Sequence, residues 1–150
     1  MNLILSELTN FIINRYDGLI PQNTWGENSF FYNPNMQFAR GTYFATIKEK
    51  NGENDKPSHL DRDGIFRLNF GTKTKTFETL FGSKPVRPAK GGTITGEYDF
   101  TKLDILTPHP IYGWMGWVCI LNPLQNSVDK ILPLIDEYYE ISKSRYAKKN

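Results

Sequence analysis

The sequence predicts a single α+β domain: a two-layer, mainly antiparallel, five-stranded sheet with helices at the N-terminus, in the middle and at the C-terminus. Apolar residues recur at helical spacing near both ends of the chain. Between these ends, short aromatic and β-branched runs alternate with turn residues. A chain of 150 residues has the usual length of one domain. The expected order is α-β(3)-α-β(2)-α, with residues 1–150 as one unit.

Both ends of the chain have the pattern of an amphipathic helix. Residues 1–16 place apolar side chains at intervals of three and four, and Asp17-Gly18 follows as a stop. The last helix has the same pattern, and we expect Pro133 to kink it and its basic end, residues 143–149, to fray. The apolar positions are Ile4, Leu5, Leu8, Phe11 and Ile12 in the first helix, and Val128, Ile131, Leu132, Ile135, Tyr138 and Tyr139 in the last.

The strands are expected in the middle of the chain. Runs 29–32, 42–48 and 65–70 are rich in aromatic and β-branched residues, and polar, Gly-rich or Pro-rich segments separate them. Two further extended runs bracket residues 113–116. The second of these, residues 117–121, is apolar on both faces, as a covered central strand would be.

A short helix is expected after the third strand. Thr72, Thr74 and Thr76 offer N-cap hydroxyls, and Gly82 stands where a helix C-cap belongs. Residues 83–96 contain prolines, glycines and basic residues without periodicity, which predicts an exposed loop.

Composition excludes several classes of protein. Hydrophobic residues make up 39% and charged residues 23%, which indicates a globular chain and no membrane helix, so we expect a cytoplasmic protein. The net charge of +2 does not by itself indicate a nucleic-acid or membrane partner. Cys119 is the only cysteine, and its apolar neighbours predict a buried thiol. No metal or cofactor motif is present.

Two segments carry a family resemblance. At HLDRDGIFRLNFG (residues 59–71) and TPHPIYGWMGWVCILNP (residues 107–123) the chain resembles a family of small bacterial proteins of unknown function. The order of its elements, and its tryptophan-led strand before the last helix, also resemble the MmcQ/YjbR-like family. That second resemblance implies an α-β(3)-α-β(2)-α layout and, for some members, DNA binding through paired wings.

The segment of residues 108–117 is the densest in candidate site residues. It places His109, Tyr112, Trp114 and Trp117 around two glycines. Aromatic rings supply apolar contact, and their N–H and O–H groups orient a ligand, so these residues are candidates for a ligand pocket. The alternative is a hairpin whose aromatic residues pack against the last helix.

Two more features have a functional and a structural interpretation. Alternation along residues 65–70 places Arg67 and Asn69 on one face, where they suit an anionic ligand, a solvent-facing sheet or an ion pair with a nearby acid. His109, held between two prolines, suits a general base, a ligand contact or a structural role.

Three functions follow, in order of preference. The first is a non-catalytic binding or interaction domain for a small molecule or protein, with Arg67, Asn69 and the hairpin aromatics on one concave surface. Substitution of Trp114 or Arg67 is then expected to weaken binding with little loss of thermal stability. The second is a DNA-binding protein that uses five basic residues: Lys73, Lys75, Lys84, Arg87 and Lys90. The third is an enzyme that uses His109 as acid or base.

Overall fold

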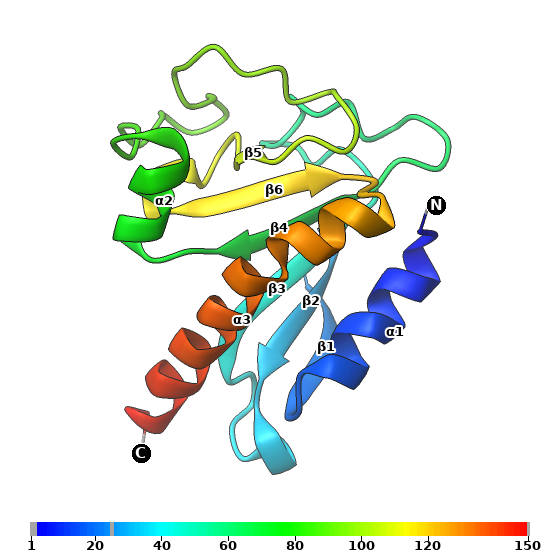
Figure 1. The fold of residues 1–150 in the computed structure, drawn as a ribbon, viewed down its shortest axis with the longest axis vertical. Helices are drawn as coiled ribbons and strands as arrows, with labels where there is room; N and C mark the ends of the chain where they lie inside the picture. The colour runs from blue at the N-terminus through cyan, green and yellow to red at the C-terminus, as the bar shows by residue number, and fades with distance from the viewer. Residues whose placement is uncertain (1–2, 25, 150) are drawn as a thin grey trace.

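The computed structural model describes residues 3–24 and 26–149, so the first two residues of the expected N-terminal helix lie outside the described part. These residues form an α+β fold with an antiparallel sheet and three α-helices, which confirms the predicted class (Figure 1). The sheet has six strands in the described residues, one more than expected.

The three helices lie where the apolar spacing predicts them. They are α1 (Leu5–Arg15), α2 (Thr74–Phe81) and α3 (Gln125–Ala147). Two details of the prediction were wrong. The N-cap of α2 is Lys73, whose side chain makes no capping hydrogen bond, and α3 stays helical to Ala147 instead of fraying from Lys143. Gly82 is the C-cap of α2 as predicted, with a φ of 83° that suits glycine.

The strands form one sheet in the order β1-β2-β3-β4-β6-β5, and each pair of neighbours is antiparallel. Four strands precede α2 instead of three, and β6 is an interior strand, between β4 and the two-residue β5, whereas its apolar sequence predicted a central strand. Their bounds are β1 (Leu19–Thr24), β2 (Glu27–Tyr32), β3 (Thr42–Lys48), β4 (Arg67–Gly71), β5 (Thr107–Pro108) and β6 (Trp117–Leu121).

The additional strand, β1, has a sequence that is not typical of a β-strand. Its residues, LIPQNT, include a proline and three polar residues, which indicate a loop. However, β1 is an edge strand that pairs with β2 alone, and an edge strand tolerates Pro21 because one of its sides needs no backbone donor.

One face of the sheet carries the main core. Helices α1 and α3 lie across this face (Figure 1). The apolar side chains of β2, β3, β4 and β6 meet the apolar sides of both helices there, and Phe77 of α2 joins the same cluster. The central members are Leu8, Ile12, Phe30, Ile47, Leu68, Phe70, Val118, Ile120, Ile131 and Ile135.

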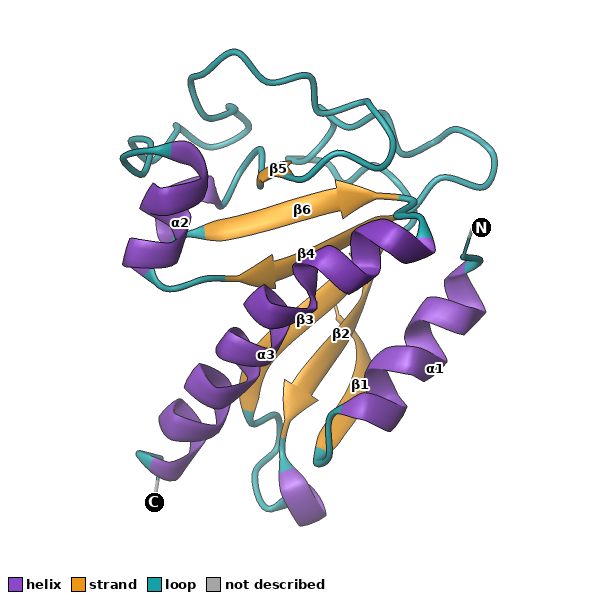
Figure 2. Cartoon of the chain, in the orientation of Figure 1, coloured by secondary structure: helices purple, strands orange, loops and turns teal. Residues whose placement is uncertain are grey.

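The other face of the sheet is covered by loops at the β4–β6–β5 end. Because Leu68 and Phe70 belong to the helix-side core, Arg67 and Asn69 point to the opposite face. Figure 2 shows long loops gathered beside β5 and β6. None of the helices that the structure describes combines the length and apolarity needed to cross a membrane.

Candidate functional site

Arg67 and Asn69 lie side by side on β4 and are both inaccessible to solvent. Arg67 is 0% exposed and Asn69 is 1% exposed, so neither forms part of a solvent-facing sheet. Arg67 Nε donates to Asn69 Oδ1 over 2.7 Å, and Asn69 Nδ2 donates to Thr46 Oγ1 on the neighbouring strand β3 over 2.9 Å. The two residues therefore belong to one buried polar network.

Asp55 balances the charge of Arg67. The carboxylate accepts from both terminal nitrogens of the guanidinium, at 3.1 Å from Nη1 and 2.5 Å from Nη2. Nη1 also donates to Ser58 Oγ over 3.0 Å. All three guanidinium nitrogens thus have partners within the protein, so Arg67 holds the loop of residues 49–66 against the sheet.

The pKa values of this pair reflect two opposing effects. Burial would raise the pKa of Asp55, but the hydrogen bonds and charge of Arg67 outweigh it, and the net pKa is lowered. Burial would lower the pKa of Arg67, and the hydrogen bond to Asp55 outweighs it. Both groups stay charged at neutral pH, as a paired buried arginine and carboxylate require.

His109 completes the network from the other loop. It is 2% exposed, and its Nε2 lies 3.2 Å from Arg67 Nη2. Its Nδ1 accepts from the backbone amides of Ile111 and Tyr112 at 3.1 and 3.0 Å. Because N–H groups face both ring nitrogens, a second ring proton is disfavoured. Burial, followed by the positive charge of Arg67, accordingly lowers the pKa of His109 well below its ordinary value.

The buried network includes residues that the sequence did not single out. Asp55 and Ser58 lie in a polar loop with the composition of a turn, and no spacing relates them to Arg67. Cys119 lies on the same sheet face and is 0% exposed, which confirms the predicted buried thiol, and burial raises its pKa. Among the described residues, no group of three His, Cys, Asp or Glu side chains is arranged to hold a metal ion.

The aromatic candidates divide between the two sides of the sheet. The Trp117 ring meets the ring of Tyr138 on α3 edge to face, with centroids 6.0 Å apart, as the structural alternative expects. Tyr112 is 49% exposed, and its ring centroid lies 5.1 Å from that of His109. Trp114 is half-buried in the short 3-10 helix Gly113–Met115.

Trp114 contacts one of the basic candidates. The guanidinium carbon of Arg87 lies 4.7 Å from the centre of the Trp114 ring, which is the geometry of a cation–π interaction. Lys84 Nζ donates to Thr74 Oγ1 over 3.0 Å, which places Lys84 beside the start of α2. The loop of residues 83–96 therefore connects the aromatic turn with α2.

We use the name basic–aromatic surface for Lys73, Lys75, Lys84, Arg87, Tyr112 and Trp114; within this set Arg87 contacts Trp114 directly, and Lys84 is bonded to Thr74 at the start of α2. Two of its segments are joined by hydrogen bonds: Thr72, beside Lys73, donates twice to the Gly116 carbonyl of the aromatic turn, through its backbone N–H over 3.0 Å and through its hydroxyl over 2.6 Å. Lys73 also forms an ion pair with Glu137 at 3.6 Å, and Lys90 is exposed further along the loop.

The fold and these contacts define a small α+β domain with a buried polar network on one sheet face and a basic–aromatic surface beside it. The model of a family of unknown function, DUF6194, matches residues 1–150, so the chain belongs to that family. Searches of curated proteins and of solved structures found no match.

Proposed function

We propose that the protein is a non-catalytic binding domain whose ligand is a single-stranded nucleic acid. The observation that carries the proposal is the Arg87–Trp114 contact at 4.7 Å, because it places an exposed basic candidate directly against a half-buried aromatic candidate. Proteins that bind single strands combine positive charge along the phosphates with aromatic rings on which bases stack.

The exposure of the basic–aromatic surface supports this proposal. Lys75, Lys84 and Arg87 are exposed, and Tyr112 is 49% exposed, so these groups are accessible without rearrangement of the fold. Lys73 is expected to contribute less to phosphate binding, because its ammonium group already forms an ion pair with the Glu137 carboxylate at 3.6 Å. We expect the phosphates to contact mainly Lys75, Lys84 and Arg87, with one base against Tyr112 or Trp114.

Arg67, Asn69 and His109 act as supports in this proposal. Their polar groups are already paired inside the protein, so they do not offer free donors to a ligand. They hold residues 109–112, which carry Tyr112, against β4. Because Arg67 is buried and paired with Asp55, we expect its substitution to lower thermal stability.

Catalysis by His109 has the least geometric support. A general base needs an available ring nitrogen with a pKa near the working pH. In His109, Nδ1 already accepts two backbone amides, Nε2 faces a guanidinium, and the pKa is well below its ordinary value.

Fluorescence anisotropy of labelled oligonucleotides tests the proposal. A mixed-sequence single strand should bind more tightly than the matching duplex, and added salt should weaken both complexes. The double variant Lys84→Ala/Arg87→Ala should lose binding, whereas Lys130→Ala/Lys148→Ala removes the same charge from exposed positions on or beside α3 and should bind normally.

Each alternative has its own outcome. Preference for the duplex would favour the DNA-binding mode implied by the MmcQ/YjbR-like resemblance. Equal loss of binding in the two double variants would mean that the oligonucleotide responds to the net charge of the protein and not to this surface. No binding at low salt would overturn the proposal.

A further inference from the structure

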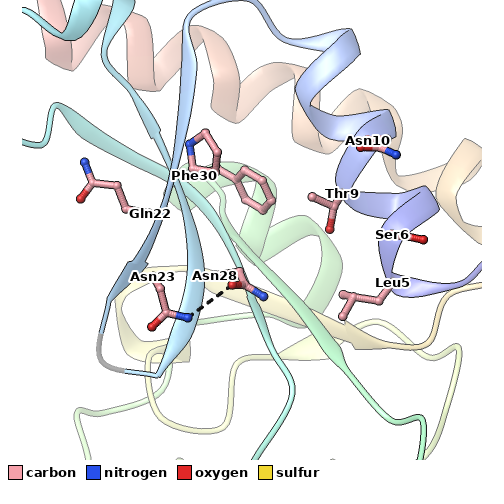
Figure 3. A pocket seen from close by; sticks show the side chains of 9 residues that line it. Leu5, Ser6, Thr9, Asn10, Gln22, Asn23, Asn28 and Phe30 are labelled. Atoms are coloured by element: carbon pink, nitrogen blue, oxygen red, sulfur yellow. Dashed lines mark hydrogen bonds between the residues drawn. The ribbon is translucent and has the colours of Figure 1, made fainter.

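We propose that the pocket between α1 and the β1–β2 hairpin binds a neutral sugar ring. This pocket lies on the helix side of the sheet, and none of its lining residues belongs to the basic–aromatic surface (Figure 3). Its volume is about 420 Å³, within the range of small-molecule sites. It is therefore a second site, independent of the proposed nucleic-acid surface.

The floor of the pocket is apolar. Leu5 of α1, Pro21 of β1 and Phe30 of β2 all line it, and Figure 3 shows the Leu5 side chain and the Phe30 ring on opposite sides of the hollow. Pro21 and Phe30 are direct cross-strand partners, so their side chains share one face of the hairpin. Phe30 is 1% exposed, so Leu5 and Pro21 supply the accessible part of this floor, on which an apolar ligand face can lie and displace water.

The rim of the pocket is polar. Ser6 and Thr9 are three residues apart on α1, so their hydroxyls lie on the same side of the helix. Neither hydroxyl has a hydrogen-bond partner among the described residues. Across the pocket, Asn23 and Asn28 contribute side-chain amides, joined by a long hydrogen bond of 3.4 Å from Asn23 Nδ2 to Asn28 Oδ1.

One of these amides is held in place from outside the pocket. Asn28 Nδ2 donates to Glu49 Oε2 over 3.0 Å, which turns the Asn28 carbonyl oxygen toward Asn23. Asn23 Oδ1 has no partner among the described residues and is free to accept from a ligand hydroxyl. A rim with one fixed amide and one free acceptor is partly preorganised for a hydroxylated ligand.

The chemistry of the lining selects the ligand class. The residues that line the pocket are all uncharged, so an anionic or cationic ligand would find no counterion there. An entirely apolar ligand would leave the amides and hydroxyls of the rim without partners. A pyranose ring carries C–H groups on a face and hydroxyls around its edge, which complements an apolar floor with a neutral polar rim.

Amide NMR titration of the full chain tests this inference. The probes are D-glucose, D-galactose, D-mannose, maltose and cellobiose, with glucose 6-phosphate as the charged comparison and p-xylene as the apolar one. At least one neutral sugar should produce saturable shifts at Ser6, Thr9, Asn23 and Asn28 with a millimolar dissociation constant, and the phosphate should bind more weakly than glucose.

Variants distinguish the pocket from non-specific binding. Thr9→Val keeps the shape but removes a hydroxyl, and Asn23→Ala removes the free amide; each should weaken sugar binding up to about tenfold. Asn14→Ala, on α1 but outside the pocket, should bind normally. Absence of pocket shifts with every neutral sugar would overturn the inference, as would equal shifts with p-xylene. Neither result tests the proposed oligonucleotide binding, because the pocket shares no residue with the basic–aromatic surface.

Discussion

Arg67 Nη2 lies 3.2 Å from His109 Nε2, and both side chains are almost completely buried. A neutral histidine beside a guanidinium provides no compensating charge, so the positive charge of Arg67 is balanced by Asp55. This arrangement joins three parts of the fold: β4, the loop of residues 49–66 and the segment that begins at β5. The Arg67–Asp55 ion pair therefore contributes to the stability of the loop-covered face by connecting these three parts.

Replacement of Arg67 should destabilise the protein strongly. Arg67→Met keeps much of the side-chain volume but leaves the Asp55 carboxylate without its partner, and breaking a buried pair in this way costs about 3–5 kcal/mol. Urea denaturation measures the loss in the free energy of unfolding.

An exposed pair in the same protein provides the control. Arg15 also forms two hydrogen bonds with a carboxylate, that of Asp136, but the side chains are 39% and 44% exposed. Arg15→Met should cost about 0–1 kcal/mol. Similar losses for the two variants would show that the buried pair does not stabilise the fold more than a surface pair does.

His109 should make stability depend on pH below its ordinary pKa of 6.5. The folded-state pKa is lowered, so below pH 6.5 the unfolded chain binds a proton that the folded chain does not bind. The free energy of unfolding should therefore fall by about 1.4 kcal/mol per pH unit as the pH decreases from 6.5 toward the folded-state pKa.

Two variants check the source of this pH dependence. His109→Gln should remove the slope, whereas His59→Asn should retain it, because His59 is exposed and asparagine tolerates its positive φ of 52°. Chemical denaturation at several pH values gives the slope. The pKa of Asp55 is lowered by Arg67, so this carboxylate does not account for a loss of stability that begins near pH 6.5. A slope that survives in His109→Gln would assign the proton to another group.

The sequence predicts those parts of the fold in which apolar residues recur at the regular spacing of a helix or a strand. The bounds of β3 and β6 agree with the predicted runs, because both strands lie within the sheet and their side chains report burial directly. Strand β1 was missed, because an edge strand can contain Pro21 and polar residues. The fraying expected after Lys143 was wrong because Tyr146 packs against Tyr32 and Phe38, which holds the end of α3.

The sites depend on contacts between distant segments, which spacing does not reveal. Alternation placed Arg67 and Asn69 on one face, but nothing in the sequence shows that Asp55 covers them from a loop. The contact between Arg87 and Trp114 also joins residues 27 positions apart with no shared motif. The amides and hydroxyls of the α1 pocket belong to residues that look like ordinary surface residues in the sequence. Only the packing of α1 against the β1–β2 hairpin brings them together.

Gly71 should not tolerate alanine. A Cβ at this position would lie 2.2 Å from Tyr138 Cζ, so the buried Tyr138 ring, α3 or the end of β4 must move. Overpacking of this kind costs about 1–3 kcal/mol or more, and Gly71→Ala should lower the urea midpoint accordingly. In a Tyr138→Ala background the ring is absent, and the added cost of Gly71→Ala should nearly disappear. Additive losses within about 0.5 kcal/mol would mean that the two residues do not interact.

The salt dependence of oligonucleotide binding should separate the roles of Arg87 and Trp114. For a single strand, each phosphate contact contributes about 0.7 to the slope of log affinity against log salt. Lys84→Ala/Arg87→Ala should therefore lower the slope by about 1.4, if each residue contacts one phosphate. Trp114→Leu removes the stacking surface but not a charge, so it should weaken binding by about 1–3 kcal/mol with the slope nearly unchanged. Anisotropy titrations at several salt concentrations measure both quantities. A slope that falls in Trp114→Leu would mean that the ring acts by positioning Arg87, and an unchanged affinity would remove Trp114 from the binding surface.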